Sequence, residues 1–283
     1  MRIAVVGAKG QLARAIVHEC TRAHEVVAFD RAGLDITDGD AVLRAMHHTR
    51  PDVIVNGAAY NAVDAAETHP VEALRLNAFA VRALARAAVE VDATLVHYGS
   101  DFVFDGLGTK PYRENDPTNP RSVYAASKLL GEWFAMDAPR AYVLRVESIF
   151  GTAPGVDLAK GSVAGIVTGL RAGTVVKVFE DRTVSPTFVI DAARATLALL
   201  EQKSATGLYH CVNSGQCTWL ELARQAAHVL NIEPRFDVVR FADVQLPAQR
   251  PQYCALSNDK LASEGIAMPS WQDALERYLK SES

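Results

Sequence analysis

The chain lacks any apolar run long enough to cross a lipid bilayer. Its uninterrupted apolar runs, such as Ile3–Val6 and Val53–Val55, have only the length of a β-strand. No basic segment followed by an apolar stretch and a small-residue cleavage site opens the sequence. We therefore expect no secretory signal, no membrane partner and a cytoplasmic location.

Cysteine is also scarce, with four residues in a chain of 283, and none of the four has the paired spacing of a metal site. A disulfide framework is not expected in a chain of this kind, so we predict reduced thiols. The pair His47–His48 ends a predicted helix, where a polar or cationic side chain suits the helix dipole. We expect no bound metal.

The chain has no excess of basic residues, because its formal net charge is −4 at pH 7. Nucleic acid is therefore not an expected partner. The sequence contains no internal repeat and no low-complexity linker. Hydrophobic residues make up 49% of its 283 positions, which is enough for a sizeable core in one large α/β unit or two fused domains.

Strand-like and helix-like patterns alternate through the first half of the chain. Five β-rich runs separated by helical patterns predict a Rossmann-type, doubly wound parallel sheet over residues 1–150. These runs cover residues 2–6, 25–30, 52–56, 93–98 and 141–146. Residues 151–283 are less regular and predict a smaller C-terminal α/β substrate lobe, with some segments returning to the first domain. In it we expect a loop at 151–161, helices at 162–172, 191–200 and 219–230, strands at 175–179 and 207–212, and a terminal helix around Leu275 and Tyr278.

A glycine turn follows the first predicted strand and opens a helix. Gly7 and Gly10 would let the backbone turn tightly and approach a pyrophosphate, and the small Ala13 would let the helix lie close to the strand. A purely structural turn is the alternative interpretation. The second strand ends in Asp30, where a ribose-binding carboxylate is expected, and Arg31 follows as a possible partner of a 2′-phosphate. Both NADPH and NADH are therefore compatible with the sequence.

Further candidates follow the next strands. Asp35 and Ile36 are placed to flank an adenine, and Ala58, Ala59 and Tyr60 follow the third strand, where small residues suit the close approach of a cofactor. Ser100 lies beyond the fourth strand, although a solvent-exposed loop serine is the alternative. Asn77, in a helix predicted from Val71 to Val91, could reach the site or serve as a satisfied packing amide.

The segment Tyr124–Lys128 places a phenol and an ammonium one helical turn apart, on one face of a predicted helix. A nearby cation lowers the pKa of a tyrosine and makes it useful in general acid-base catalysis. An ordinary exposed pair on a surface helix is the alternative, because this spacing alone is not specific.

Together, the glycine turn, the acid after the second strand, the serine after the fourth and Tyr-x-x-x-Lys in the next helix resemble the extended short-chain dehydrogenase/reductase family. Within it, several segments look like those of the dTDP-4-dehydrorhamnose reductases. They are Gly10–Leu12, Asn56–Glu67, His97–Gly106 and Tyr124–Glu132, with Pro186–Thr187, Gly207–His210, Thr218–Trp219, Arg250–Pro251 and Trp271 in the second half.

The resemblance implies an NADPH- or NADH-dependent reduction of the 4-keto group of a nucleotide-linked deoxysugar, dTDP-4-dehydrorhamnose to dTDP-rhamnose. It implies that Tyr124 donates a proton, that Lys128 binds the nicotinamide ribose and lowers the pKa of Tyr124, and that Ser100 contacts the carbonyl oxygen. Gln11 and Leu12 would join the cofactor site. Asp101 and Ser148 would contact the sugar, and Arg250 would bind the diphosphate or anchor a loop. A homodimer is compatible with the resemblance.

Two departures leave the substrate open. The family usually has threonine at the position of Ser100, which keeps the hydroxyl, and it tends to carry Arg-Thr-Ser-Trp where this chain has Arg145–Ser148. The tryptophan is thus replaced by Ser148, and a carboxylate stands at Glu147. One alternative is a reductase or epimerase acting on another nucleotide sugar or ketone. Another is a non-catalytic, nucleotide-binding regulatory subunit.

Overall fold

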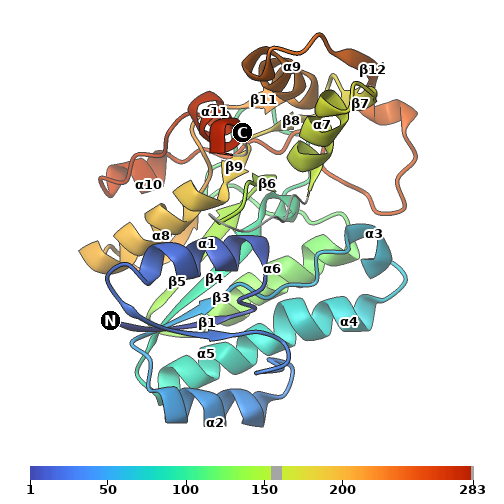
Figure 1. The fold of residues 1–283 in the computed structure, drawn as a ribbon. Coiled ribbons are helices and arrows are strands. Elements are labelled where there is room, and N and C mark those ends of the chain that lie inside the picture. Colours follow the sequence, from blue (N-terminus) through green and yellow to red (C-terminus); the bar gives the residue numbers. More distant parts are fainter. Residues whose placement is uncertain (154–160, 282–283) are drawn as a thin grey trace.

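The central element is a six-stranded sheet in which every neighbouring pair is parallel (Figure 1). The computed structural model describes residues 1–153 and 161–281. The strands are β1 (Arg2–Val6), β2 (Glu25–Phe29), β3 (Val53–Asn56), β4 (Thr94–Ser100), β5 (Ala141–Val146) and β10 (Gly207–His210). Their order is β10-β5-β4-β3-β1-β2. The chain therefore changes direction across the sheet between β1 and β3, and such a switch point opens a crevice at the carboxyl ends of the strands.

Helices cover both faces of this sheet, which confirms the predicted α/β fold (Figure 1). The helices α1 (Gln11–Cys20) and α8 (Val189–Gln202) pack together on one face. On the other face α2 (Gly39–Thr49), α5 (Ala80–Glu90) and α6 (Val123–Ala135) lie side by side. Alternate residues of β1 serve the two cores, Ile3 and Val5 on the α1 side and Ala4 and Val6 on the α2 side. A strand buried on both faces needs this unbroken apolar sequence.

The segment expected to form one long helix is helical throughout and contains one π-helical turn. After the short α3 (Val63–Ala66), the chain forms α4 (Pro70–Leu74), a π-helical segment (Arg75–Phe79) and then α5. The helix predicted from Val71 to Val91 is therefore present, running without a gap from Pro70 to Glu90, and the sequence missed only its π-helical turn. The buried amide of Asn77 lies in the π-helical segment, and turns of this kind often occur where a helix carries a functional side chain.

The C-terminal part forms small sheets and helices beside the carboxyl edge of the main sheet (Figure 1). Three two-stranded pairs occur there: β7 (Val175–Phe179) with β12 (Arg235–Val239), β8 (Thr183–Val184) with β11 (Cys217–Thr218), and β6 (Ile149–Phe150) with β9 (Thr187–Phe188). Its helices are α7 (Ser162–Arg171), α9 (Trp219–Leu230), α10 (Asp259–Ser263) and α11 (Trp271–Ser281).

Most elements expected after residue 150 are present near their predicted bounds. The helices and strands predicted at 162–172, 175–179, 191–200 and 219–230 correspond to α7, β7, α8 and α9. The strand predicted at 207–212 is β10, which joins the main sheet beside β5. Of the loop predicted at 151–161, residues 154–160 lie outside the described residues.

The four cysteines are free and buried. Within residues 1–153 and 161–281, none of the helices combines the length and the apolar composition that a membrane span requires.

Candidate active site

A groove of about 990 Å³ lies at the carboxyl ends of β1, β2 and β3, where the strand order changes direction. Nine of the predicted cofactor residues line it together: Gly7, Gly10, Asp30, Arg31, Asp35, Ile36, Ala58, Ala59 and Tyr60. Residues that the sequence did not single out complete the lining, among them Lys9, Leu34, Thr37, Glu72 and Arg75. The strand ends therefore bring scattered residues into one site, as expected from their positions in the sheet.

The glycine turn forms a cradle that a side chain would fill. Gly7 has a φ of +70°, and a Cβ atom there would lie 2.6 Å from the backbone nitrogen of Ala58. A Cβ atom on Gly57 would lie 2.6 Å from that of Ala13, so the small residues let α1 pack against the loop after β3. The first turn of α1 has no side-chain cap, which leaves its N–H groups available to an anion. The cradle thus fits a pyrophosphate.

Gln11 and Leu12 contribute no side chain to the lining of this groove. The Gln11 amide donates to the carbonyl oxygen of Gly151 at 2.7 Å, and Leu12 is buried in the core. Only the backbone N–H groups of these two residues are therefore placed for a cofactor, and their assignment to the cofactor site stays a prediction.

Asp30 is paired at the floor of the groove. Its carboxylate accepts hydrogen bonds from the backbone N–H of Gly33 at 2.9 Å and lies 2.5 Å from Nζ of Lys9. The hydrogen bond from Lys9, followed by that from Gly33, lowers the pKa of Asp30 below its ordinary value. The exposed Arg31 lies beside this pair. This end of the groove thus combines one carboxylate with two cations.

The catalytic candidates meet where β4 ends and α6 begins. Ser100 ends β4 opposite Val146 of β5, and its hydroxyl donates to Oδ1 of Asp101 at 3.1 Å. Tyr124 is 8% exposed in the first turn of α6, and its ring packs edge-on against Phe102 at 5.5 Å. Tyr124 also packs in one apolar cluster with Tyr60, which lines the groove. The predicted serine and tyrosine are therefore together, next to the groove.

The electrostatics of Tyr124 differ from the expectation. Burial, with the charge of Asp101, raises the pKa of Tyr124 above its ordinary value, and a hydrogen bond with Ser100 opposes this only in part. Lys128 is also buried, and its Nζ donates to the carbonyl oxygen of Tyr98 at 2.6 Å. Burial lowers the pKa of Lys128 to about 8. In this arrangement the phenol keeps its proton at neutral pH, and the lowering of the Tyr124 pKa by Lys128 stays a prediction.

The Asn77 side chain links the Tyr60 loop, which lines the groove, to α6. Its Oδ1 accepts from the backbone N–H of Tyr60 at 2.7 Å, and its Nδ2 donates to the Tyr60 carbonyl at 3.1 Å and to the Ser127 hydroxyl at 2.9 Å. Ser127 in turn donates to the Tyr124 carbonyl at 2.7 Å. Asn77 is thus the satisfied packing amide that the sequence analysis considered, and it fixes the Tyr60 loop against α6.

A buried polar cluster lies behind Ser100, and sequence reasoning found only parts of it. Asp101, Glu147 and Cys254 place one oxygen or sulfur atom each within 4.8 Å of one another. The guanidinium of Arg182 donates to Cys254 Sγ at 3.7 Å and to the Pro251 carbonyl at 3.1 Å. Because a fixed cation already adjoins these groups, the arrangement favours a charge network over a metal site.

The last two predicted substrate residues, Ser148 and Arg250, are not among the members of this cluster. Ser148 has a φ of +42°, and its carbonyl accepts from the backbone N–H of Thr187 at 3.5 Å. Arg250 donates to Oδ2 of Asp64 at 2.7 Å, and Asp64 also accepts from the Ala248 backbone. In this structure Arg250 anchors a loop, which is one of the two roles expected for it.

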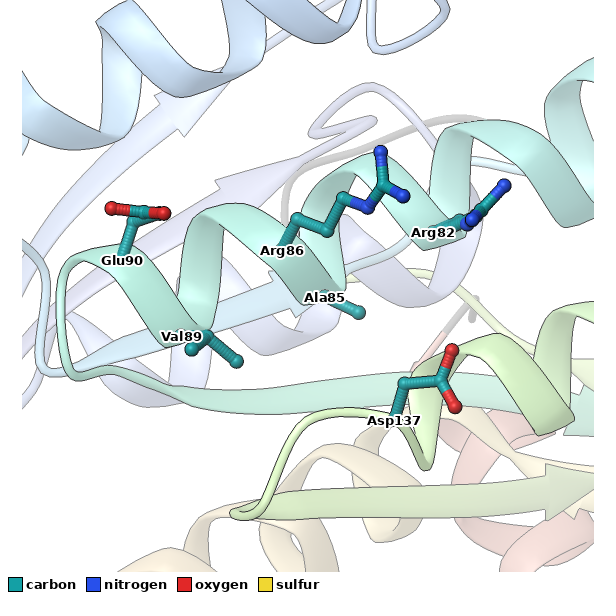
Figure 2. Close-up of a pocket in the computed structure, with 6 residues that line it drawn as sticks. All are labelled: Arg82, Ala85, Arg86, Val89, Glu90 and Asp137. Atoms are coloured by element: carbon teal, nitrogen blue, oxygen red, sulfur yellow. The ribbon is translucent and has the colours of Figure 1, made fainter.

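A second hollow lies on the surface of α5 (Figure 2). Arg82, Ala85, Arg86, Val89 and Glu90 of α5 line it together with Asp137, which follows α6. Figure 2 shows these side chains on the flank of the helix, with Asp137 facing it from the neighbouring segment. None of the predicted site residues lines it.

Comparison with known proteins agrees with this geometry. The family model described as RmlD substrate binding domain matches residues 1–283. A dTDP-4-dehydrorhamnose reductase from Streptomyces griseus is 34% identical, covering 96% of this chain and 90% of that protein. The "Probable dTDP-4,6-dihydroxy-2-methyloxan-3-one 4-ketoreductase" of Streptomyces antibioticus is 35% identical, covering 97% and 93%.

A solved structure of a dTDP-4-dehydrorhamnose reductase also matches this chain over its full length. A dTDP-4-dehydrorhamnose reductase from Bacillus anthracis, solved in complex with NADP, superposes with a TM-score of 0.92 at 30% identity and covers 100% of this chain and 99% of that one. The matched family model, the parallel sheet and the Tyr124–Lys128 helix all agree with one family. The chain belongs to the RmlD substrate binding domain family and thereby to the extended short-chain dehydrogenases/reductases.

Proposed function

We propose that the protein is an NAD(P)H-dependent oxidoreductase that reduces the 4-keto group of a nucleotide-linked deoxysugar, converting dTDP-4-dehydrorhamnose to dTDP-rhamnose. One observation supports it above all: a glycine-lined groove at the switch point of the sheet adjoins a buried tyrosine and serine. The named reductases of this family and the NADP-bound relative support the same reaction.

In the proposed reaction the nicotinamide cofactor supplies the hydride that adds to the carbonyl carbon. Tyr124 donates its phenolic proton to the oxygen as negative charge develops there. The raised pKa of Tyr124 suits this direction, because the group is protonated and ready to donate at neutral pH. Ser100 would donate a hydrogen bond to the same oxygen and hold it in place.

The remaining residues would position the two reactants. The backbone at Gly7, Gly10 and the start of α1 would hold the pyrophosphate, and Asp30 with Arg31 the adenosine ribose. Lys128, held by the Tyr98 carbonyl, would bind the nicotinamide ribose. Asp101 and Ser148 would contact the sugar, and Arg250 would border the diphosphate end while it anchors its loop to Asp64.

Substitution of Tyr124 by phenylalanine tests this assignment. We expect the hydride-transfer rate with dTDP-4-dehydrorhamnose to fall by about 10²–10⁴-fold, the usual contribution of a general acid, with unchanged cofactor affinity. Tyr209→Phe is the matched control, because Tyr209 is buried in β10 and its hydroxyl donates to the Ala205 carbonyl instead. Full turnover by the Tyr124 variant would rule out the proposed mechanism.

A reductase or epimerase of another nucleotide sugar is the second candidate. It is favoured by Ser148 and Glu147, which stand where the family tends to carry tryptophan and serine, and by the relative named as a 4-ketoreductase of a different sugar nucleotide. Measuring NADPH and NADH oxidation across a panel of keto-sugar nucleotides would rank the substrates.

A non-catalytic regulatory subunit is the third candidate. The retained Tyr124 and Lys128 argue against it, because a protein that only binds a nucleotide has no need of a proton donor. Turnover of any keto-sugar nucleotide would exclude a purely regulatory role, and a stoichiometric enzyme partner without turnover would support it.

A cytoplasmic location and a homodimer are further parts of this proposal. Exposed apolar side chains on α5, α6 and their flanking turns (Phe79, Val89, Trp133 and Met136) support self-association through this face. Analytical ultracentrifugation of the wild type and of Trp133→Glu would test the dimer, and cell fractionation would test the location.

A further inference from the structure

Two carboxyl groups are buried behind Ser100, and one neighbouring cation acts on them among the described residues. Asp101 is 4% exposed and Glu147 is 1% exposed, and Arg182 is the guanidinium whose charge acts on both. Burial of an isolated charge in a protein interior is costly, so such groups are neutralised by a partner or by a proton. One guanidinium can balance only one of these two carboxylates.

One carboxyl oxygen of the cluster has no hydrogen-bond partner among the described residues. Oε2 of Glu147 accepts from the backbone N–H of Ser185 at 2.6 Å, whereas Oε1 is buried and has no partner among the described residues. Two N–H groups of Arg182 donate to the Pro251 carbonyl and to Cys254 Sγ, and neither of these donates to Glu147. An unpartnered carboxylate oxygen costs more than an unpartnered oxygen of a neutral acid, so the geometry favours one retained proton on the pair.

The raised pKa values of both carboxyl groups also favour a retained proton. Burial raises the pKa of Asp101 to about 6, against the charge of Arg182. Burial, reinforced by the charge of Asp101, raises the pKa of Glu147 well above its ordinary value. Two carboxyls this close titrate as a pair and not as separate groups.

The state of the pair determines what Ser100 can do. A serine hydroxyl has one hydrogen to donate. While Asp101 is ionised it can only accept, so that hydrogen is directed to Oδ1 of Asp101, 3.1 Å from the Ser100 oxygen. When Asp101 carries a proton it can donate to the Ser100 oxygen instead, and the serine hydrogen is then free to point towards Tyr124 and the reacting oxygen.

We propose that Glu147 is a positioning residue which shares one proton with Asp101 behind the catalytic serine, and that this proton turns the Ser100 hydroxyl towards the carbonyl oxygen of the substrate. The inference rests on the proposed ketone reduction and adds to it the group that sets the direction of the serine hydrogen bond. It also assigns a use to Glu147, a departure from the family pattern that the reaction scheme leaves unexplained.

The expected pH dependence follows from the groups that surround the pair. Arg182, Cys254, Tyr253, Cys217, Tyr124 and the hydroxyl of Ser100 adjoin it. Loss of the shared proton as the pH rises would lower kcat, since Ser100 would then donate to Asp101. Lys128, whose pKa is about 8, produces a separate decline at higher pH that no change in the pair should remove.

Two variants test the inference through the pH profile of kcat. In Glu147→Gln the neutral amide removes the second negative charge, so Asp101 ionises more readily beside Arg182. We expect kcat at neutral pH to fall about tenfold and its decline to move about one pH unit or more towards acid. In Asp101→Asn the amide can donate to Ser100 at every pH, so we expect the decline due to the pair to disappear while that of Lys128 stays.

Asp191→Asn is the matched control, because Asp191 is a buried carboxylate that pairs with Arg277 away from Tyr124. We expect it to change stability and leave the pH profile of kcat unaltered. A wild-type profile in Glu147→Gln or in Asp101→Asn would overturn the inference. If one variant does not fold, the other decides.

Infrared spectroscopy provides a readout that needs no turnover. The wild type should show the carbonyl band of a protonated carboxylic acid at neutral pH, and Glu147→Gln should lose it, because Asp101 then ionises beside Arg182. Absence of this band from the wild type would overturn the inference whatever the substrate is. A wild type that has the band and reduces no keto-sugar would instead refute the proposed function alone.

Discussion

Replacement of Asn77 by alanine should weaken the contact between the Tyr60 loop, which lines the groove, and α6. The Asn77 amide makes three hydrogen bonds, two to the backbone of Tyr60 and one to the Ser127 hydroxyl. Asn77 itself is 1% exposed, so the groups left behind cannot all turn to water. An unsatisfied buried donor or acceptor costs about 1–3 kcal/mol, and the three losses share one site and are not additive.

We therefore expect the free energy of unfolding of Asn77→Ala to fall by about 3 kcal/mol in urea titration. Its KM for the cofactor should also rise, since Tyr60 lines the groove. Asn119→Ala is the matched control, because Asn119 is exposed and makes one long hydrogen bond of 3.3 Å to Asp105. A surface substitution of this kind should cost less than about 0.5 kcal/mol. Equal losses in the two variants would refute the bridging role of Asn77.

Three further predictions concern charged residues. Arg31→Ala should raise the KM for NADPH about tenfold and leave that for NADH unchanged; equal effects on both would exclude contact with the 2′-phosphate. Arg145→Met should destabilise the protein by about 3–5 kcal/mol in urea, because it leaves Glu132 buried without the guanidinium 2.8 Å away. The double variant with Glu132→Met should recover most of this, and no recovery would contradict the pairing. Burial lowers the pKa of Lys128 from 10.5 to about 8, so the unfolded chain binds more protons between these values. The stability of the wild type relative to Lys128→Met should therefore rise by about 3 kcal/mol as the pH increases from about 8 to 10.5, and a flat difference would contradict the burial of the charged form.

The sequence predicts the groove well because its residues have fixed positions relative to the strands. Gly7, Asp30 and Ala58 each follow a strand of one parallel sheet, and the carboxyl ends of such strands share an edge. Alternation of strand and helix therefore suffices to bring them together. The sequence does not predict a role for Lys9, because nothing in a glycine turn distinguishes an exposed lysine until its partner, Asp30, is known.

Other features depend on burial, which the sequence does not display. The Tyr124–Lys128 spacing predicts a shared helix face, but not that Asp101 and a dry environment would raise the pKa of the phenol. The π-helical segment differs from an α-helix by a slight widening of the turn, which an alanine-rich apolar pattern does not resolve. The cluster behind Ser100 combines Asp101, Glu147, Arg182 and Cys254 from four distant segments, so only the fold reveals it.

The most direct test of the account is a crystal structure of the protein with NADPH and a keto-sugar nucleotide or its reduced product. The account predicts the pyrophosphate at the Gly7–Gly10 turn, the nicotinamide ring next to Tyr124, and the phenolic oxygen within hydrogen-bond distance of the oxygen on C4 of the sugar. A dinucleotide bound outside the groove, or a Tyr124 hydroxyl directed away from both ligands, would contradict it.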